Sequence, residues 1–178
     1  MGQYLNMMID SSRRGRGLAE KLLVGIKPEQ AARKPHFETP AAPQLIDTNH
    51  PTFCYGHLAI YPARMLKVAG LDSTAAACPP EWDNLFKAGS PCLDDKDGTI
   101  YPAFSTITAA LFKNMDAAFA QLSTLDDKVL LNQMPDERYR EFFPTVGIGL
   151  NFLLNNHVMM HLGQVSVWRR CFGLPSAM

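Results

Sequence analysis

The stretch FSTITAALFKNMDAAFAQLSTL, residues 104–125, carries the clearest folding signal in this chain. Its apolar residues recur at alternating spacings of three and four positions, which is the period of an α-helix with one buried face. Pro102, just before the stretch, suits the first turn of a helix. The sequence therefore predicts a long amphipathic helix that opens near Pro102, with a stripe made of Phe104, Ile107/Thr108, Leu111, Met115, Ala118, Leu122 and Leu125.

Three other segments show the same helical period. Each is bounded by residues that commonly begin or end helices, such as Asn or Thr at the start and Gly or Pro after the end. The expected helices run from about Tyr4 to Ile26, from Thr48 or Asn49 to about Ala69, and from Thr145 to about Phe172.

Two long connections separate the first three helices. Residues 28–47 contain four prolines, and residues 71–100 are rich in Pro, Gly, Ser and Asp, with a short helical turn expected at Glu81–Lys87. No alternating apolar run is long enough to predict a strand. The predicted fold class is all-α: one four-helix bundle formed by residues 1–178, with a long crossover between its second and third helices.

Composition argues against several classes of function. Seventeen Lys and Arg residues balance 17 Asp and Glu residues, so no excess positive charge favours nucleic acid. The most apolar region, residues 146–168, contains Asn, His and Gln side chains that would be costly inside a membrane. The four cysteines form no CxxC pair, and the first residues lack the pattern of a signal peptide. We therefore expect a reduced, soluble, cytoplasmic protein with neither a nucleic-acid nor a membrane partner.

The most specific chemical signal is HVMMHLGQ, residues 157–164, in the last expected helix. His157 and His161 are four residues apart, so they rise by about 6 Å and lie on one face, where both imidazoles can meet a single ion. The rest of this face is apolar. A buried imidazole without a partner costs roughly 1–3 kcal/mol. A metal ion would satisfy both rings, and so would hydrogen bonds to the backbone or to Asn155 and Asn156.

A third histidine, His57, lies in FCYGHLAIY, residues 53–61, on the second expected helix. Its neighbours one turn away are mostly apolar, so its ring also faces the core. Gly56 beside it would allow another helix, or a ligand, to approach closely. A single histidine of this kind is usually a hydrogen-bonded core residue. Three inward-facing histidines on two helices instead favour a shared metal ion.

Two segments resemble the DinB/YfiT-like superfamily. NHPTFCYGHLAI, residues 49–60, is similar to its second-helix motif, and HVMMHLGQVSVWRRCFGLP, residues 157–175, is similar to its C-terminal signature. Helix order and loop lengths extend the resemblance over essentially the whole chain. It implies an up-down-down-up bundle, often a homodimer, that holds one divalent metal ion, zinc or nickel, on His57, His157 and His161.

Three further residues could belong to the site. Gln164 lies one turn beyond His161, where it could hydrogen-bond to a metal ligand, line a pocket or simply pack. Tyr61 and Arg64 follow His57 by one and two turns and could contact a substrate beside the metal.

Other prominent side chains have simpler interpretations. His50, at the start of the second helix, is expected to be a surface or capping residue, and His36 to be exposed in a proline-rich loop. Met159 and Met160 are expected to pack in the core or between helices.

Three imidazoles leave open coordination positions, which is typical of a catalytic ion. Such an ion can lower the pKa of a thiol or of water. The resemblance implies a transferase or isomerase that uses a low-molecular-weight thiol cosubstrate, such as bacillithiol or mycothiol, or else a hydrolase, acting on a small molecule. No convincing carboxylate base accompanies the histidines, which favours a thiol. The alternative is a non-catalytic stress or interaction protein with a structural or vestigial metal site.

Overall fold

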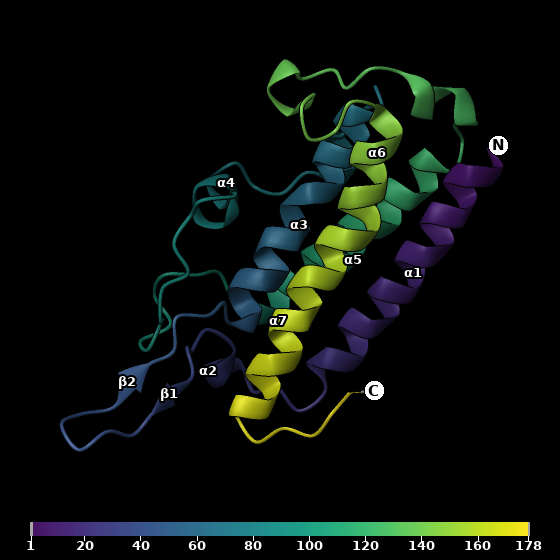
Figure 1. The fold of residues 1–178 in the computed structure, drawn as a ribbon. Helices are drawn as coiled ribbons and strands as arrows, with labels where there is room; N and C mark the ends of the chain where they lie inside the picture. The colour runs from purple at the N-terminus through teal and green to yellow at the C-terminus, as the bar shows by residue number, and fades with distance from the viewer. Residues whose placement is uncertain (1, 178) are drawn as a thin grey trace.

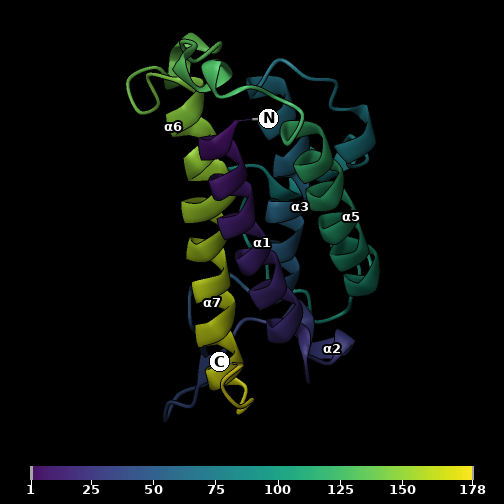
Figure 2. The same cartoon turned by 90° about the vertical axis from the view of Figure 1, so that its right-hand side faces the viewer.

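Four long helical runs dominate the structure, a computed structural model that describes residues 2–177. The runs lie side by side (Figures 1 and 2): α3 contacts α5 and α7, and α1 contacts the same two helices. The predicted mostly α protein with four main helices is therefore confirmed. The four runs are α1 (Gln3–Leu23), α3 (Pro51–Val68), α5 (Phe104–Leu122), and α6 (Val146–Asn151) followed by a π-helical segment (Phe152–Asn156) and α7 (His157–Cys171).

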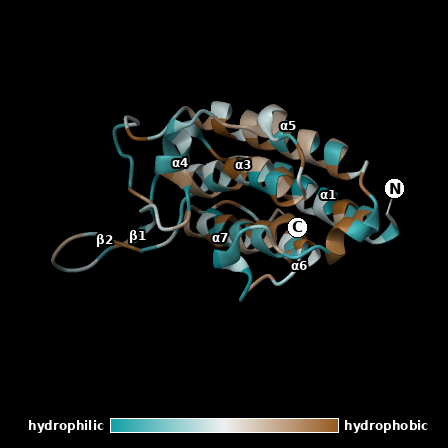
Figure 3. Ribbon diagram, turned by 90° about the horizontal axis from the view of Figure 1, so that it is seen from above, coloured by the Kyte–Doolittle hydropathy of each residue, from teal (hydrophilic) through white to brown (hydrophobic). Residues whose placement is uncertain are grey.

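The connections contain short elements. They are α2 (Pro28–Ala31), β1 (His36–Phe37), β2 (Gln44–Leu45), α4 (Glu81–Phe86) and 3-10 turns at Thr74–Ala76, Asp127–Leu131 and Glu137–Tyr139. Helix α4 confirms the predicted helical turn. The antiparallel pair of β1 and β2 projects away from the helices (Figure 3) and was not predicted, because two-residue strands are too short for an alternating pattern.

The beginning of α1 is held by a residue from a distant part of the chain. Its N-cap, Gly2, has no side chain that could accept a hydrogen bond. The Asp127 carboxylate instead accepts from the backbone N–H groups of Tyr4 and Leu5, at 3.0 and 2.9 Å. The Gly2 N–H donates to the carbonyl of Leu125 at 3.1 Å. Free N–H groups at a helix start need such acceptors, so α1 begins beside the end of α5.

The beginning of α3 is capped by His50. Its Nδ1 accepts from the Phe53 N–H at 3.1 Å, and its Nε2 lies 2.8 Å from the Leu93 carbonyl, to which it donates. The ring is fully buried, and burial lowers the pKa of His50 to about 4. The capping role expected from the sequence is confirmed, whereas the expected surface position is wrong, because the connection at Leu93 covers the ring.

The end of α7 is tied to the end of α1 through Arg169. Its guanidinium is buried and donates to the carbonyls of Leu22 and Val24, at 2.9 and 2.6 Å, and to that of Pro175 at 3.0 Å. The last carbonyls of a helix lack partners within the helix. Arg169 satisfies them and fixes α7 against α1.

One cluster of buried apolar side chains lies between the helices. It includes the predicted stripe of α5, namely Ile107, Leu111, Met115, Ala118 and Leu122. Met159 and Met160, expected in the core or between helices, are instead 48% and 52% exposed. No helix within residues 2–177 combines the length and the apolar character needed to cross a membrane.

Candidate metal centre

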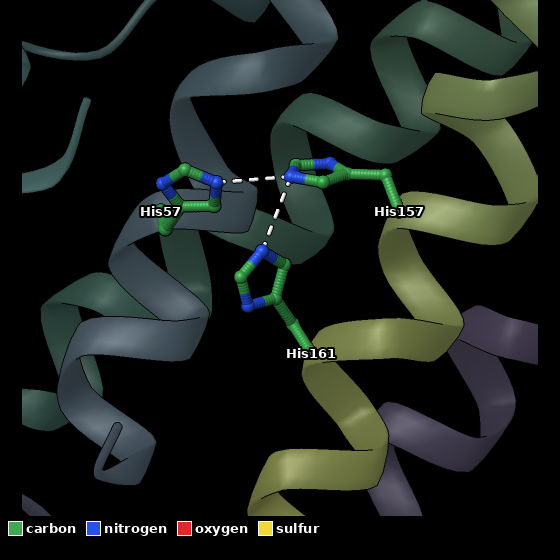
Figure 4. A group of neighbouring side chains, drawn as sticks. All are labelled: His57, His157 and His161. Atoms are coloured by element: carbon green, nitrogen blue, oxygen red, sulfur yellow. Dashed lines mark hydrogen bonds between the residues drawn. The ribbon is translucent and has the colours of Figure 1, made fainter. Parts of the chain in front are cut away.

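The three histidines predicted to share a site lie together in the structure. His57 comes from α3, and His157 and His161 come from α7 (Figure 4). All three are buried. The Nε2 atom of His157 lies 2.9 Å from Nε2 of His57 and 3.2 Å from Nε2 of His161. The three possible ligand atoms all lie within 4.8 Å of one another, so the predicted convergence on one centre is confirmed.

These separations suit the ligands of one metal ion. Imidazole nitrogens bind zinc at about 2.0–2.1 Å, and two ligands of a tetrahedral ion at that radius are about 3.3 Å apart. The observed 2.9 and 3.2 Å are close to this value. The cluster could therefore hold a metal ion.

Two of the rings have their protonation fixed by neighbouring carbonyl groups. Nδ1 of His57 lies 2.5 Å from the carbonyl oxygen of Phe86, and Nδ1 of His161 lies 2.9 Å from Oε1 of Gln164. A carbonyl oxygen only accepts, so both Nδ1 atoms carry the proton. The Nε2 atoms of these two rings therefore present lone pairs toward His157.

The third ring cannot satisfy both lone pairs. Nε2 of His157 carries at most one proton, which is shared between two acceptors or absent. Its Nδ1 is buried without a hydrogen-bond partner in residues 2–177. The cluster thus has more buried lone pairs than protons to fill them, and a cation would remove this imbalance.

The pKa values also favour metal binding. Burial, together with the nearby His161, lowers the pKa of His57 to about 4 and that of His157 to about 3. Burial lowers the pKa of His161 as well. All three imidazoles are therefore neutral near pH 7, which is the form that binds metal.

Gln164, one of the additional candidates, lies directly behind a predicted ligand. Its Oε1 accepts from Nδ1 of His161 and from Nδ2 of Asn49, the latter at 3.1 Å, and the Cys54 thiol lies 3.5 Å away. Hydrogen bonding of this kind orients a metal-binding imidazole. Of the interpretations open for Gln164, the geometry supports a partner to the ligand. Sequence reasoning did not include Asn49 in the site.

The other two candidates lie at different distances from the cluster. The ring of Tyr61 packs against those of His57 and His157, with centroids 4.7 and 4.3 Å apart. The Arg64 guanidinium lies over the Tyr61 ring, 4.6 Å from its centroid, and pairs with Asp83. Tyr61 thus contacts the histidines, whereas Arg64 contacts Tyr61, and its positive charge helps to lower the pKa of His57 and His157.

Helix α4 supports the cluster through Gly56. A Cβ at Gly56 would lie 2.3 Å from the Phe86 ring, so only glycine lets the end of α4 pack this closely on α3. That approach brings the Phe86 carbonyl to His57. The close approach expected at Gly56 is confirmed, but sequence reasoning missed Phe86, because a backbone carbonyl has no residue-type signature.

A π-helical segment immediately precedes His157. Its residues, Phe152–Asn156, interrupt what the sequence predicted as one α-helix. Segments of this kind are frequent at functional sites. The Leu154 carbonyl within it accepts from the Ser12 hydroxyl of α1 at 2.7 Å, so a contact from another helix accompanies the changed winding.

The histidines line a cavity of about 420 Å³, here called the histidine cavity. This volume is within the usual range for small-molecule sites. No Asp or Glu lines it in the described part of the chain, in agreement with the absence of a carboxylate base inferred from the sequence. Its other lining residues are Asn49, Phe53, Tyr61, Lys87, Ala88, Gly89, Ser90, Phe152 and Met160.

Comparison of the sequence with known protein families finds no family that matches, and no curated protein matches it either. The likeness to the DinB/YfiT-like superfamily rests on residues 49–60 and 157–175. The structure establishes a mostly helical protein with a buried three-histidine cluster that could bind a metal ion.

Proposed function

We propose that this chain is a divalent-metal-dependent enzyme of the DinB-like type, with zinc or nickel held by His57, His157 and His161. One observation carries the proposal: two Nε2 lone pairs, fixed by their Nδ1 hydrogen bonds, face the third ring inside the core. An apolar core gains nothing from such an arrangement, because unpaired buried polar atoms destabilise the folded state. A metal ion is the simplest group that satisfies all three nitrogens.

The proposal includes the up-down-down-up order of the helices. The contacts at the helix ends support it: α1 begins beside the end of α5, and α7 ends beside the end of α1. Helix α3 begins beside the last turns of α7. These neighbours are consistent with α1 and α7 running in one direction and with α3 and α5 running in the other.

A divalent ion, when bound, would supply a Lewis acid that lowers the pKa of a thiol or of water. The chain holds its three imidazoles neutral and aimed at one point. Burial raises the pKa of Tyr61, so its hydroxyl stays protonated and can donate a hydrogen bond to a small molecule in the cavity. No carboxylate in the described lining can take a proton. This favours a thiol as the nucleophile, since a thiol loses its proton more readily than water does.

The cavity also favours an enzyme over a protein with a sealed structural ion. Closed structural sites surround the metal with protein ligands, whereas catalytic sites leave a position open. Here three side chains converge, and their rings line a hollow large enough for a small molecule. We therefore propose a thiol-dependent transferase, with hydrolysis as the other reaction that the same site could support.

Metal analysis tests the first part of the proposal. The full-length protein, purified without chelator and supplied with zinc or nickel, should contain about one equivalent of metal. His161→Ala should lose most of it, while His36→Ala, which changes an exposed histidine elsewhere, should retain it. Equal metal in the parent and in His161→Ala, or no metal in the parent, would contradict the proposal.

Activity measurements test the second part. The metal-loaded protein should accelerate transfer of a small thiol to an electrophile, and the rate should fall to background in His161→Ala. Acceleration of ester or amide hydrolysis without added thiol would instead identify a hydrolase. A metal-loaded protein that accelerates neither reaction over a broad panel would favour the structural alternative.

A further inference from the structure

The histidine cavity adjoins a second cavity of about 250 Å³, here called the apolar slot. The two share Tyr61, Ala88 and Phe152 in their walls. Beyond these shared residues, the slot is lined by the apolar side chains of Val68, Met134, Phe143 and Leu153, together with Gly149, Tyr139 and the charged Arg64. A molecule whose one end lies beside the histidines could therefore extend an apolar body into the slot.

A third hollow of about 510 Å³, the basic hollow, adjoins both. It shares Lys87 and Ala88 with the histidine cavity. With the apolar slot it shares Arg64, Val68, Ala88, Met134 and Tyr139. Charged side chains make up most of its wall. They are Arg64, Lys67, Lys87 and Arg138, together with Asp83 and Asp136.

The charges in the basic hollow do not cancel. Its two carboxylates are already paired with its two arginines. Lys67 and Lys87 make no ion pair within residues 2–177. Exposed lysines are common on protein surfaces, but these two line the basic hollow, and Lys87 also lines the histidine cavity. Lys87 directly follows Phe86, whose carbonyl accepts the hydrogen bond from His57. An uncompensated positive charge beside an apolar slot is complementary to an organic anion.

We propose that these three adjoining hollows form one groove that binds a small organic anion. The apolar body of the anion would lie in the apolar slot, its carboxylate or similar group beside Lys67 and Lys87, and its reactive end in the histidine cavity. The proposal names the substrate class for the function proposed above and rests on it. The two ammonium groups are exposed and screened by salt, so they add selectivity more than affinity.

Binding of matched probes tests the inference. We would titrate 4-phenylbutyrate, 4-phenyl-1-butanol and butyrate into the full-length, metal-free protein at low ionic strength and measure affinity by calorimetry. The acid should bind about fivefold more tightly than the alcohol, the effect expected from roughly 1 kcal/mol of exposed charge pairing. Butyrate should bind at least about tenfold more weakly than 4-phenylbutyrate, because it cannot fill the apolar slot.

Variants of the two lysines test whether they bind the carboxylate of the probe. In Lys67→Gln/Lys87→Gln the preference for the acid should disappear, while binding of the alcohol is unchanged. The matched control, Lys96→Gln/Lys113→Gln, removes two exposed lysines outside the groove and should keep the preference. Equal affinity for acid and alcohol in the parent, no binding of either probe, or a preference that persists in Lys67→Gln/Lys87→Gln would overturn the inference.

The same titration in metal-free His161→Ala separates this inference from the proposed function. A lysine-dependent preference there would keep the anion site even if the protein held no metal. A metal-loaded parent without that preference would remove the anion site and leave the metal centre standing.

Discussion

Two buried polar groups on the same helix, α7, satisfy their hydrogen-bonding atoms in different ways. Arg169 donates to three backbone carbonyls from the end of α1 and from the chain after α7, and only its Nε lacks a partner. About two and three turns earlier on the same helix, His161 and His157 form a cluster with a third imidazole, His57. Nε2 of His157 lies at short distances from Nε2 of both other rings.

The difference separates a structural polar group from a candidate binding site. Arg169 has only donors, and the chain supplies the acceptors, so the group is nearly complete without a ligand. In the histidine cluster, the Nε2 lone pairs of two rings face a third ring that has at most one proton to share between them. The described residues supply no cation that would satisfy these lone pairs. Burial of polar atoms is common to both, and it is the unmet hydrogen-bonding capacity that indicates a ligand.

The largest effect on stability should come from removing Arg169, whose hydrogen bonds are nearly all satisfied by the chain itself. Arg169→Ala should lower the free energy of unfolding by about 3–5 kcal/mol, because it leaves buried carbonyls without donors and opens a cavity. Urea denaturation measures the change, which should not depend on added zinc. Arg170→Ala, an exposed neighbour, should change stability by less than about 0.5 kcal/mol. A loss below about 1 kcal/mol for Arg169→Ala would break the comparison.

Acid should lower the free energy of unfolding through a buried histidine. His50, which begins the helix that carries His57, has its pKa lowered to about 4 by burial. The unfolded chain takes up a proton near pH 6.5 and the folded chain does not, so stability is complete above about pH 6.5 and falls as the pH drops toward 4. Between pH 7.5 and pH 5 this one group should cost about 2 kcal/mol.

His50→Asn isolates that contribution. Asparagine is a good N-cap but does not titrate. The free energy of unfolding of the His50→Asn variant in urea should therefore fall less between the two pH values than that of the parent. An equal fall in both proteins would place the acid sensitivity elsewhere.

The smallest effect should concern the orientation of one ligand. Gln164→Leu removes the acceptor for Nδ1 of His161 and should weaken zinc binding by about tenfold. Gln164→Glu keeps an acceptor and should retain tight binding, which a purely packing role would not predict. Competition with a fluorescent zinc indicator measures the affinities, with the exposed Gln3→Leu as the matched control. Unchanged affinity in Gln164→Leu would show that the hydrogen bond does not position His161.

The most successful sequence predictions concerned features that repeat along the chain or depend on residue type. The stripe within residues 104–125 is buried in α5 because helical periodicity records which face meets the core. His57, His157 and His161 could be grouped because imidazole on an apolar face is costly without a partner. Each of these inferences needed only local sequence and general chemistry.

Other features could not be read in this way. The carboxylate that caps α1 comes from Asp127, more than 120 positions away. The carbonyl that orients His57 belongs to Phe86, and any residue type at that position would carry one. The exposure of Met159 and Met160 depends on where neighbouring helices end, which no residue of α7 reveals.

The helices and the set of histidines follow from the sequence alone, since periodicity and side-chain chemistry are local properties of the chain. That the three Nε2 atoms meet, that two of them carry lone pairs and that a cavity lies beside them follows only from the packed structure. These depend on distances between segments about 100 residues apart, and such distances are set by how whole helices pack rather than by any one of them.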